Sequence, residues 1–385
     1  MQVLLAPSAF AGTLTAAQAA DTLATGWRRG APHDEVRTLP LSDGGLGFAD
    51  VLARSLPGAR SLPVTVTGPV GARVASVVVL DEDGTAYVDA ATAAGAHLMR
   101  DPAGQLETAT SRGVGELVLA AAAAGARRVV VGVRDLGCHD GGAGLLAALA
   151  PGALPALGHG PLPLAEVTAA DLAGIEECRQ PLRCVELVLA TDVEEPLLGL
   201  GGATAMKAAD GALPPGLAAA VESALGHFAE RVRRVVPERV DLVTGTPLRP
   251  DRLAGSGAGG GVGYALHLLG ATRVGGAHCV AAAVGLGGAV QESDLVVTGE
   301  GCLDWRSLHA GVVPGVAAAA LETGTPAVAV VGSTMVGRRE SQALGLSAVY
   351  AVAETSAQVR ASMADPVESL AARTAAVART WSPYR

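Results

Sequence analysis

The chain contains the stretch Leu295-Val-Val-Thr-Gly-Glu-Gly-Cys-Leu-Asp-Trp-Arg-Ser-Leu-His309, in which an apolar run leads into a polar turn spaced by glycines. The apolar residues predict a buried strand. The turn after them carries four side chains that could contact a ligand: Glu300, Asp304, Ser307 and His309. In an open α/β sheet, ligands gather beyond the carboxyl ends of the strands. The pattern therefore predicts an α/β fold with its chemistry near position 300.

Similar apolar runs alternate with alanine-rich stretches along the rest of the chain. Such alternation predicts a parallel sheet with helices on both faces. Thr15 and Gln18 are spaced as in a capping box, which gives the first helix a defined start. Strands are expected at 3–6, 36–41, 129–133, 295–298, 328–331 and 349–352, and helices at 15–29, 113–124, 142–150, 314–322 and 366–377.

At 385 residues the chain exceeds the usual size of a single core, so two domains are expected. Short β-rich runs occupy 63–92, where Asp81-Glu-Asp-Gly84 is typical of a hairpin turn. The stretch 151–164, rich in proline and leucine, has the composition of a linker into another lobe. We predict one domain from 1–62, 105–150 and 289–385, a second from 63–104 and 151–288, and a binding site in the cleft between them.

The charge balance limits the classes of partner. The net charge is −9, so the diffuse field repels nucleic acid and anionic membranes. Lys207 is the single lysine, and arginine must therefore supply most contacts to phosphate.

The cysteine and hydropathy patterns predict a cytoplasmic protein. The five cysteines form no Cys-x-x-Cys pair and no Cys/His metal spacing, so we expect reduced thiols. The start Met1-Gln-Val-Leu-Leu lacks a basic region, and no signal peptide is expected. Charged residues interrupt the longest apolar runs, so no membrane-spanning segment is expected either.

Two further apolar runs end in acidic turns. Asp43 precedes Gly44 and Gly45, whose backbone N–H groups could approach phosphate oxygens, and Asp192 follows the run 187–191. A tight strand-to-helix turn would select the same glycines. Ordinary surface carboxylates would explain either acid taken alone.

Histidine and arginine side chains offer further candidates. His139 next to Asp140 is more typical of a turn residue than of a ligand. Arg112, Arg134 and Arg306 are candidate clamps for a carboxylate or phosphate, because a guanidinium matches either anion bidentately. Each could equally be a solvated surface charge.

The segment Gly255-Ser-Gly-Ala-Gly-Gly-Gly261 satisfies the pattern G-x-G-x-x-G. No buried strand is expected before it and no acidic residue lies at the expected distance after it, which argues against a dinucleotide fold. It also lacks the G-K-[ST] ending of a Walker A loop. We interpret it as a flexible glycine loop opening a helix at 264–269, whose N-terminus could receive an anion, with close packing as an equal alternative.

Taken together, these turns resemble the type I family of glycerate kinases, and more closely its actinobacterial branch. The resemblance extends to Leu4-Leu-Ala-Pro-Ser-Ala-Phe10, to Thr110-Ser-Arg-Gly-Val-Gly-Glu116 and to the glycine segment, and it covers nearly the whole chain. It implies a flavodoxin/Rossmann-like lobe with a parallel sheet, together with a discontinuous second α/β lobe. It also implies ATP and Mg²⁺ as cofactors, D-glycerate or a similar hydroxy acid as substrate, and leaves a homodimer open.

Phosphoryl transfer requires positioned phosphates, metal-bound carboxylates and donors near the transferring group. The resemblance implies three catalytic aspartates, two of which would also bind Mg²⁺. The catalytic set is Asp43, Asp192 and Asp304, with Asp192 and Asp304 as the metal ligands. The substrate would contact Ser8, Arg306, Ser307 and His309, and the nucleotide would contact Gly44, Gly45, Gly257, Gly259, Gly260 and Glu300.

Some polar positions depart from the family pattern. Ser8 replaces the usual acid, Cys302 replaces an arginine, and the glycine-lysine expected after His309 is Ala310-Gly311. Removing a cation that faces developing charge can cost on the order of a thousandfold in phosphoryl transfer. Two alternatives therefore stay open: a member without catalysis that binds a small anion as a sensor, and a kinase with a changed substrate.

Overall fold

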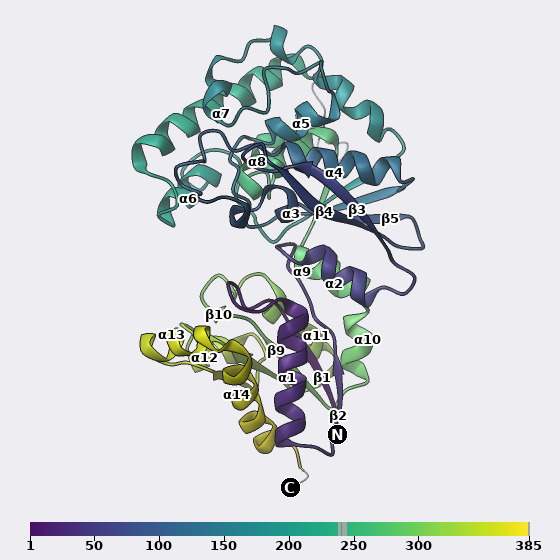
Figure 1. Cartoon of the computed structure of the whole chain (residues 1–385), viewed down its shortest axis with the longest axis vertical. Helices are drawn as coiled ribbons and strands as arrows, with labels where there is room; N and C mark the ends of the chain where they lie inside the picture. The colour runs from purple at the N-terminus through teal and green to yellow at the C-terminus, as the bar shows by residue number, and fades with distance from the viewer. Residues whose placement is uncertain (238–239, 241–244, 384–385) are drawn as a thin grey trace. The chain divides into compact units, whose positions relative to one another are not determined.

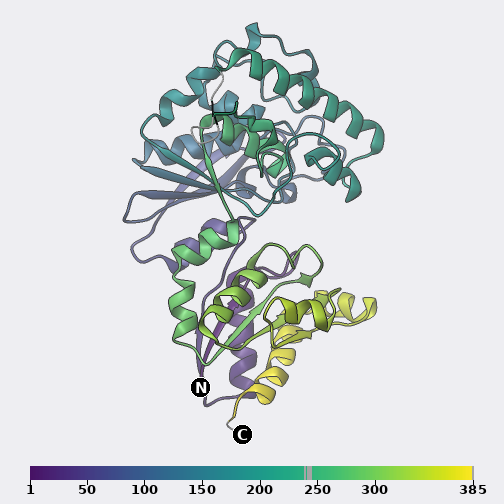
Figure 2. The ribbon, with the colours of Figure 1, turned by 180° about the vertical axis from the view of Figure 1, so that it is seen from behind.

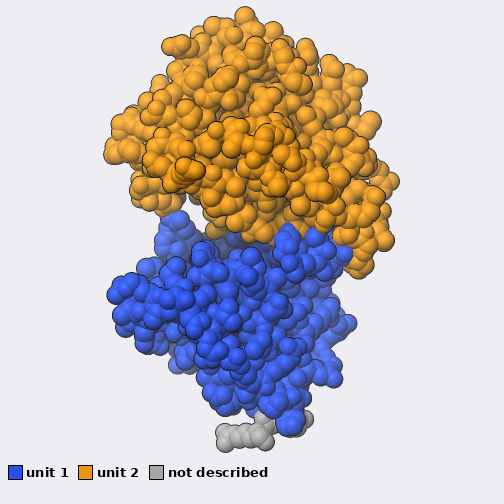
Figure 3. All heavy atoms as spheres, viewed as in Figure 1, with its two compact units in different colours: residues 1–43, 50–56, 275–385 blue, residues 44–49, 57–274 orange. Residues whose placement is uncertain are grey.

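The computed structural model describes residues 1–237, 240 and 245–383, which divide into two compact units (Figure 3). Unit 1 comprises Met1–Asp43, Asp50–Leu56 and Gly275–Arg385, and unit 2 comprises Gly44–Ala49 and Pro57–Val274. Each unit is built around its own β-sheet, and the helices and strands are labelled in Figure 1.

Unit 1 contains a five-stranded parallel sheet in the order β13-β11-β9-β1-β2. Its central strands β9 and β11 are buried along their whole length, as expected for strands covered on both faces. Helices α1 and α14 lie in front of this sheet in Figure 1, and α11 lies in front of it in Figure 2. The strands are β1 (Gln2–Pro7), β2 (Glu35–Thr38), β9 (Leu295–Gly299), β11 (Ala327–Val331) and β13 (Ala348–Ala351).

The helices of unit 1 pack an alanine- and valine-rich core against that sheet. A separate two-stranded sheet joins β10 (Cys302–Leu303) to β12 (Ser333–Thr334). The helices are α1 (Ala16–Gly30), most of α2 (Phe48–Ser55), α9 (Gly276–Ala283), α10 (Leu286–Gln291), α11 (Val312–Thr323), α12 (Arg338–Ala343), α13 (Ser356–Ala364) and α14 (Pro366–Trp381).

Unit 2 contains a six-stranded mixed sheet in the order β3-β4-β5-β6-β7-β8. The strands from β5 to β8 run parallel, whereas β3, β4 and β5 are antiparallel neighbours. The strands are β3 (Arg60–Thr67), β4 (Arg73–Leu80), β5 (Thr85–Asp89), β6 (Arg128–Gly132), β7 (Glu186–Ala190) and β8 (Thr272–Val274).

Helices of very different length cover the sheet of unit 2. The α-helices are α3 (Ala91–Ala94), α4 (Arg112–Ala123), α5 (Ala143–Leu149), α6 (Ala203–Ala209), α7 (Pro215–Val235) and α8 (Ala258–Leu269). Short 3₁₀ helices span Ala96–Leu98, Leu162–Glu166, Ala170–Leu172, Ile175–Leu182 and Pro250–Arg252.

The structure confirms the predicted α/β class with parallel sheets and two units. All six predicted strands and all five predicted helices are present within a few residues of the expected bounds. The capping box is also present, because Thr15 Oγ1 accepts the N–H of Gln18 and the Gln18 side chain accepts the N–H of Thr15. Among the described residues, no helix has the length and apolar character needed to cross a membrane.

The boundaries of the units differ from those expected. Residues 105–150 lie in unit 2, because β6 pairs with both β5 and β7 of that sheet. The proline- and leucine-rich stretch 151–164 lies inside unit 2 and does not link it to unit 1, while 275–288 belongs to unit 1. Helix α8 begins at Ala258, but Gly259, Gly260 and Gly261 have non-helical backbone angles, so its regular part starts within a few residues of the expected 264–269.

Candidate active site

In unit 1, Ser8 and Glu300 follow two neighbouring parallel strands at the same edge of the sheet. β1 and β9 pair so that Pro7 lies opposite Gly299, and the N–H of Ser8 donates to the carbonyl of Gly299 at 2.8 Å. The two side chains that the sequence places after these strands therefore begin from adjacent points. The backbones of Ser8 and Glu300 therefore lie side by side where β1 and β9 end.

The turn after β9 is held close to β11. A Cβ on Gly299 would lie 2.0 Å from the carbonyl oxygen of Val330, so only glycine fits there. The N–H of Gly332 donates to the carbonyl of Glu300 at 3.0 Å, and the N–H of Ser333 donates to that of Gly301 at 3.0 Å. Backbone hydrogen bonds thus fix the path of the turn before it reaches Asp304.

Asp304 organises the second half of the same turn. Its Oδ1 accepts the N–H of Arg306 at 2.8 Å and the N–H of Ser307 at 3.2 Å. This is the geometry of an aspartate that closes a turn through its own side chain. Asp304, Arg306 and Ser307 are therefore brought together, and His309 follows on the exposed surface with its N–H bonded to the carbonyl of Arg306 at 3.1 Å.

The side chains of Trp305 and Arg306 stack on each other at this turn. Trp305 is 60 % exposed, and the guanidinium carbon of Arg306 lies 5.3 Å from the centre of its ring. Such a cation–π contact limits the directions that the arginine side chain takes. Arg306 therefore has a partly defined orientation on the surface of unit 1.

Asp43 ends the first segment of unit 1, next to β1. The chain after β2 continues alongside that strand, because the N–H of Leu39 donates to Leu5 and the N–H of Leu41 donates to Pro7, at 2.8 and 2.9 Å. Asp43 is half-buried two residues after Leu41. Ser8 directly follows the carboxyl end of β1, and the segment that ends in Asp43 runs alongside that end.

The glycines after Asp43 belong to unit 2. Gly44 and Gly47 have φ angles of +93° and +96°, a region that favours glycine. The carbonyl of Gly44 would lie 2.9 Å from a Cβ built on Gly132, at the carboxyl end of β6. The Gly44–Gly47 turn therefore packs closely on the sheet of unit 2.

Asp192 lies beyond the carboxyl end of β7 in unit 2. The preceding Thr191 is buried, and its hydroxyl donates to the carbonyl of Val133 at 2.8 Å, while the N–H of Val193 donates back to that hydroxyl at 3.2 Å. The loops after β6 and β7 are thereby tied together. Asp192 itself is half-buried.

The glycine segment 255–261 packs against the chain after Asp192. The N–H of Gly257 donates to the carbonyl of Glu195 at 2.9 Å. Gly259, Gly260 and Gly261 have φ angles of +59°, +66° and +98°, which kink the first turn of α8. A Cβ on Gly260 would lie 2.4 Å from the carbonyl of Cys138. Close packing therefore selects these glycines, and they also lie in the region where the loops after β6 and β7 meet.

His139 and Asp140 are buried, a feature that their sequence context does not reveal. His139 Nε2 lies 3.1 Å from Thr204 Oγ1, and burial lowers the pKa of this histidine to about 3, so its ring is neutral. Burial raises the pKa of Asp140, although hydrogen bonds from Ser111 oppose the rise. Lys207 lies nearby, donates to the carbonyl of Leu136 at 3.3 Å, and has its pKa lowered by burial.

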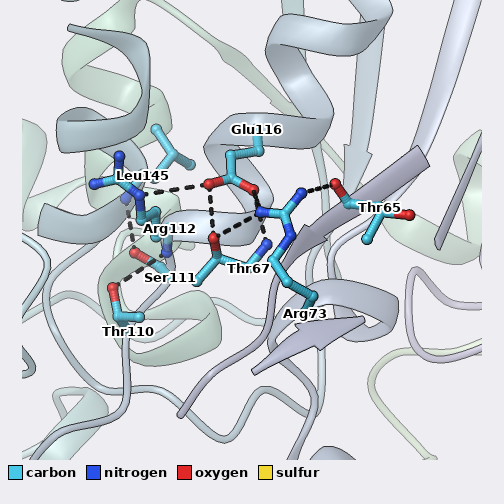
Figure 4. Close-up of polar contacts among 8 residues, drawn as sticks. All are labelled: Thr65, Thr67, Arg73, Thr110, Ser111, Arg112, Glu116 and Leu145. Carbon is cyan, nitrogen blue, oxygen red and sulfur yellow. Dashed lines mark hydrogen bonds and ion pairs between the residues drawn. The ribbon is translucent and has the colours of Figure 1, made fainter. Parts of the chain in front are cut away.

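Arg112 pairs with a carboxylate inside unit 2 (Figure 4). Its Nε lies 3.4 Å from Glu116 Oε1, and Arg73 approaches the other oxygen of Glu116 at 3.2 Å. Glu116 also accepts the N–H and the hydroxyl of Thr67, at 2.7 and 2.8 Å. The cluster joins β3 and β4 to α4, so the structure gives Arg112 a packing role that the sequence did not indicate.

Within residues 1–237, 240 and 245–383, no three histidine, cysteine, aspartate or glutamate side chains gather closely enough to hold a metal ion by themselves. Mg²⁺ in phosphoryl-transfer enzymes is commonly held by one or two carboxylates together with substrate phosphates.

Comparison with known proteins gives one consistent result. A glycerate kinase of Bacillus subtilis is 33% identical over 362 residues, covering 91% of this chain and 90% of that protein. A glycerate 2-kinase of Escherichia coli is 30% identical over the same coverage. A crystal structure of a candidate glycerate kinase 2 from Salmonella typhimurium LT2 superposes with a TM-score of 0.76 at 29% identity, covering 99% of this chain and 98% of that one. The sequence model of the glycerate kinase family matches residues 3–382. The chain therefore belongs to the glycerate kinase family.

Proposed function

We propose that this protein is an ATP-dependent kinase that transfers the γ-phosphoryl group to a hydroxyl of D-glycerate or a closely similar small hydroxy acid. The observation that carries the proposal is the polar turn from Glu300 to His309, built at the carboxyl end of β9 in a chain of this family. Relatives named glycerate kinase and glycerate 2-kinase support the substrate class. The fixed backbone of the turn supports a role in positioning rather than in packing alone.

We assign binding of the acid substrate to unit 1. A guanidinium matches a carboxylate in shape and charge, so Arg306 would hold the acid group, with the stacking on Trp305 limiting its motion. Ser307, His309 and Ser8 would hydrogen-bond the remaining oxygens. Asp304 is oriented by the two N–H groups that its Oδ1 accepts, and would hold or accept the proton of the attacking hydroxyl.

We assign the phosphate contacts to glycine-rich backbone, in the turns of Gly44 and Gly45 and of Gly257, Gly259 and Gly260. Gly44, Gly259 and Gly260 have positive φ, a backbone conformation that can turn neighbouring N–H groups toward an anion. The N–H of Gly257 donates to Glu195 and that of Gly260 donates to Gly257, so these two would have to exchange partners to contact phosphate. Glu300 is the remaining residue that we assign to the nucleotide. Asp43 precedes the first of these turns and would act on the reacting groups as the third catalytic carboxylate.

We assign binding of Mg²⁺ to Asp192 and Asp304. Asp192 and Asp304 are half-buried carboxylates at strand ends, and carboxylate oxygens are the ligands that Mg²⁺ prefers. Bound Mg²⁺ would neutralise charge on the β- and γ-phosphate oxygens. Its other ligands would then come from those phosphates and from water.

A coupled assay of ADP release, with Mg²⁺-ATP and D-glycerate, tests the proposal. We expect turnover that falls at least a hundredfold in Asp304→Ala, as for loss of a positioned proton acceptor. Asp365→Ala is the matched control, because Asp365 also accepts a backbone N–H in unit 1, from Glu368 at 3.4 Å at the start of α14. Its turnover should match the wild type. The phosphorus NMR spectrum of the product then identifies the phosphorylated hydroxyl.

Two results would contradict the proposal. Folded wild-type protein that releases no ADP with a panel of small hydroxy acids would favour the anion-binding alternative. Equal loss of turnover in Asp304→Ala and Asp365→Ala would show that the effect comes from the fold and not from the site.

A further inference from the structure

Asp89 is a buried carboxylate at the carboxyl end of a parallel strand, and no motif in the sequence identifies it. It is the last residue of β5, which pairs with β6 so that Asp89 lies opposite Gly132. Only 1 % of its surface is exposed. A carboxylate buried to this extent must be satisfied by donors within the protein.

The donors to Asp89 are backbone N–H groups from two different segments. Oδ2 accepts the N–H of Gly47 at 2.8 Å, and Oδ1 accepts the N–H of Ala91 at 3.0 Å. Burial raises the pKa of Asp89 to about 7, while these backbone hydrogen bonds oppose the rise. The carboxylate therefore links the start of α3 to the turn that follows Asp43.

Other contacts also hold this turn, since the N–H of Phe48 donates to the carbonyl of Gly45 at 3.0 Å. Gly44 and Gly47 both adopt positive φ, and glycine loses more conformational freedom than any other residue when it is ordered. The turn rests on Gly132, where a Cβ would lie 2.8 Å from the ring of Phe48 and 2.9 Å from the carbonyl of Gly44. This contact supports the turn from one side, and the hydrogen bond to Asp89 sets its direction.

We propose that Asp89 is the positioning residue of the Asp43–Gly47 turn. By holding the N–H of Gly47, it sets the path of the Gly44–Gly45 backbone and of Asp43 immediately before it. The inference rests on the proposed function, which assigns phosphate contacts to these glycines and catalysis to Asp43. Asp89 itself acts through the turn, because its two oxygens are occupied by Gly47 and Ala91.

The variant Asp89→Asn tests this role with almost no change in volume. Both oxygens of Asp89 face N–H donors, so either orientation of an asparagine places its NH₂ group against one of them. A displacement of about 1 Å in catalytic groups can cost on the order of a hundredfold in rate. We therefore expect kcat to fall 10- to 100-fold, in line with that magnitude.

Asp81→Asn is the matched control in the same unit. Asp81 Oδ1 accepts the N–H of Thr85 at 2.7 Å and its Oδ2 accepts the hydroxyl of Tyr87 at 3.2 Å, in the hairpin between β4 and β5. The substitution removes a half-buried carboxylate that also accepts two hydrogen bonds, at the other end of β5. We expect Asp81→Asn to lower the unfolding temperature but to keep kcat within about twofold, because a surface turn distant in sequence from the catalytic motifs is altered.

Hydrogen exchange gives a readout that does not require activity. In Asp89→Asn, the amides of Gly47 and Phe48 should exchange at least tenfold faster than in the wild type, whereas in Asp81→Asn they should be unchanged. If the wild type shows no turnover, the proposed kinase function fails while this measurement still decides the role of Asp89. Unchanged exchange at Gly47 in Asp89→Asn, or equal losses of kcat in the two variants, would overturn the inference.

Discussion

Asp140 accepts both the backbone N–H and the hydroxyl of Ser111, at 2.9 and 3.0 Å, in the interior of unit 2. The same carboxylate accepts the N–H groups of Gly142 and Gly144 at 3.1 Å. Ser111 precedes α4 and Gly142 precedes α5. One buried carboxylate therefore satisfies N–H groups at the start of two helices, where no backbone acceptors are available and negative charge is favoured.

Replacing this carboxylate should destabilise unit 2. Asp140→Asn places an NH₂ group against an N–H donor in either orientation, and a buried unsatisfied donor costs about 1–3 kcal/mol. We expect a loss of about 1–3 kcal/mol in the free energy of unfolding, measured by urea titration. Asp171→Asn is the control, because Asp171 makes a similar cap with the N–H of Thr168 at 2.8 Å on the exposed surface. A loss no larger than that of the control would contradict the prediction.

The packing of α1 on α14 depends on glycine in unit 1. A Cβ on Gly26 would lie 2.4 Å from the carbonyl of Ala371 and 2.7 Å from the Cβ of Thr374. Alanine normally stabilises a helix interior by about 1 kcal/mol over glycine. Gly26→Ala should instead destabilise the protein by about 1–3 kcal/mol, because the two helices must separate.

A second glycine provides the matched control for this packing prediction. Gly226 lies inside α7, and a Cβ there would meet no atom within 4 Å. Gly226→Ala should therefore raise the unfolding temperature, since only helix propensity changes. Thermal unfolding of both variants checks the pair, and a shift in the same direction for both would show that contact with α14 does not decide the effect.

The sequence predicts local structure well in this protein and predicts long-range contacts poorly. The strands around 295–298 and 328–331 are read correctly, because continuous apolar runs bounded by turns are a local signal. The capping box at Thr15 is local as well. By contrast, the bond between Asp89 and Gly47 spans two segments that only the folded sheet brings together.

The same distinction explains two differences between expectation and structure. Residues 105–150 lie in unit 2 because β6 enters the sheet between β5 and β7, and strand order is not a local property. The long helix α7 is absent from the expected helices, although Val221, Leu225, Phe228 and Val232 recur at helical spacing and are buried. The helical spacing of these apolar residues is visible in the sequence and would have identified the helix.

Burial of His139 predicts a pH dependence of stability. The unfolded chain protonates this residue near pH 6.5, whereas the folded protein does so only near pH 3. Between these values the unfolded state binds more protons, so stability falls as the pH decreases. At pH 5 this contribution amounts to a loss of about 2 kcal/mol relative to pH 7.5. In His139→Asn the decline between pH 7.5 and pH 5 should be smaller by about that amount. Parallel curves for the two proteins, measured by urea unfolding, would contradict this assignment.

The proposed role of Arg306 predicts that its replacement weakens binding of the acid substrate and leaves binding of the nucleotide unchanged. If its guanidinium holds the carboxylate of the acid, Arg306→Gln should raise KM for D-glycerate by at least tenfold, since a charge-assisted hydrogen bond contributes about 1.5–3 kcal/mol. KM for ATP should change little, because the phosphate contacts are assigned to the glycine-rich backbone. Arg379→Gln, an exposed change in the last turn of α14, should leave both constants unaltered. A rise in KM for ATP alone would instead place Arg306 at the nucleotide. The acid group would then have to be bound by Ser8, Ser307 and His309 without a guanidinium.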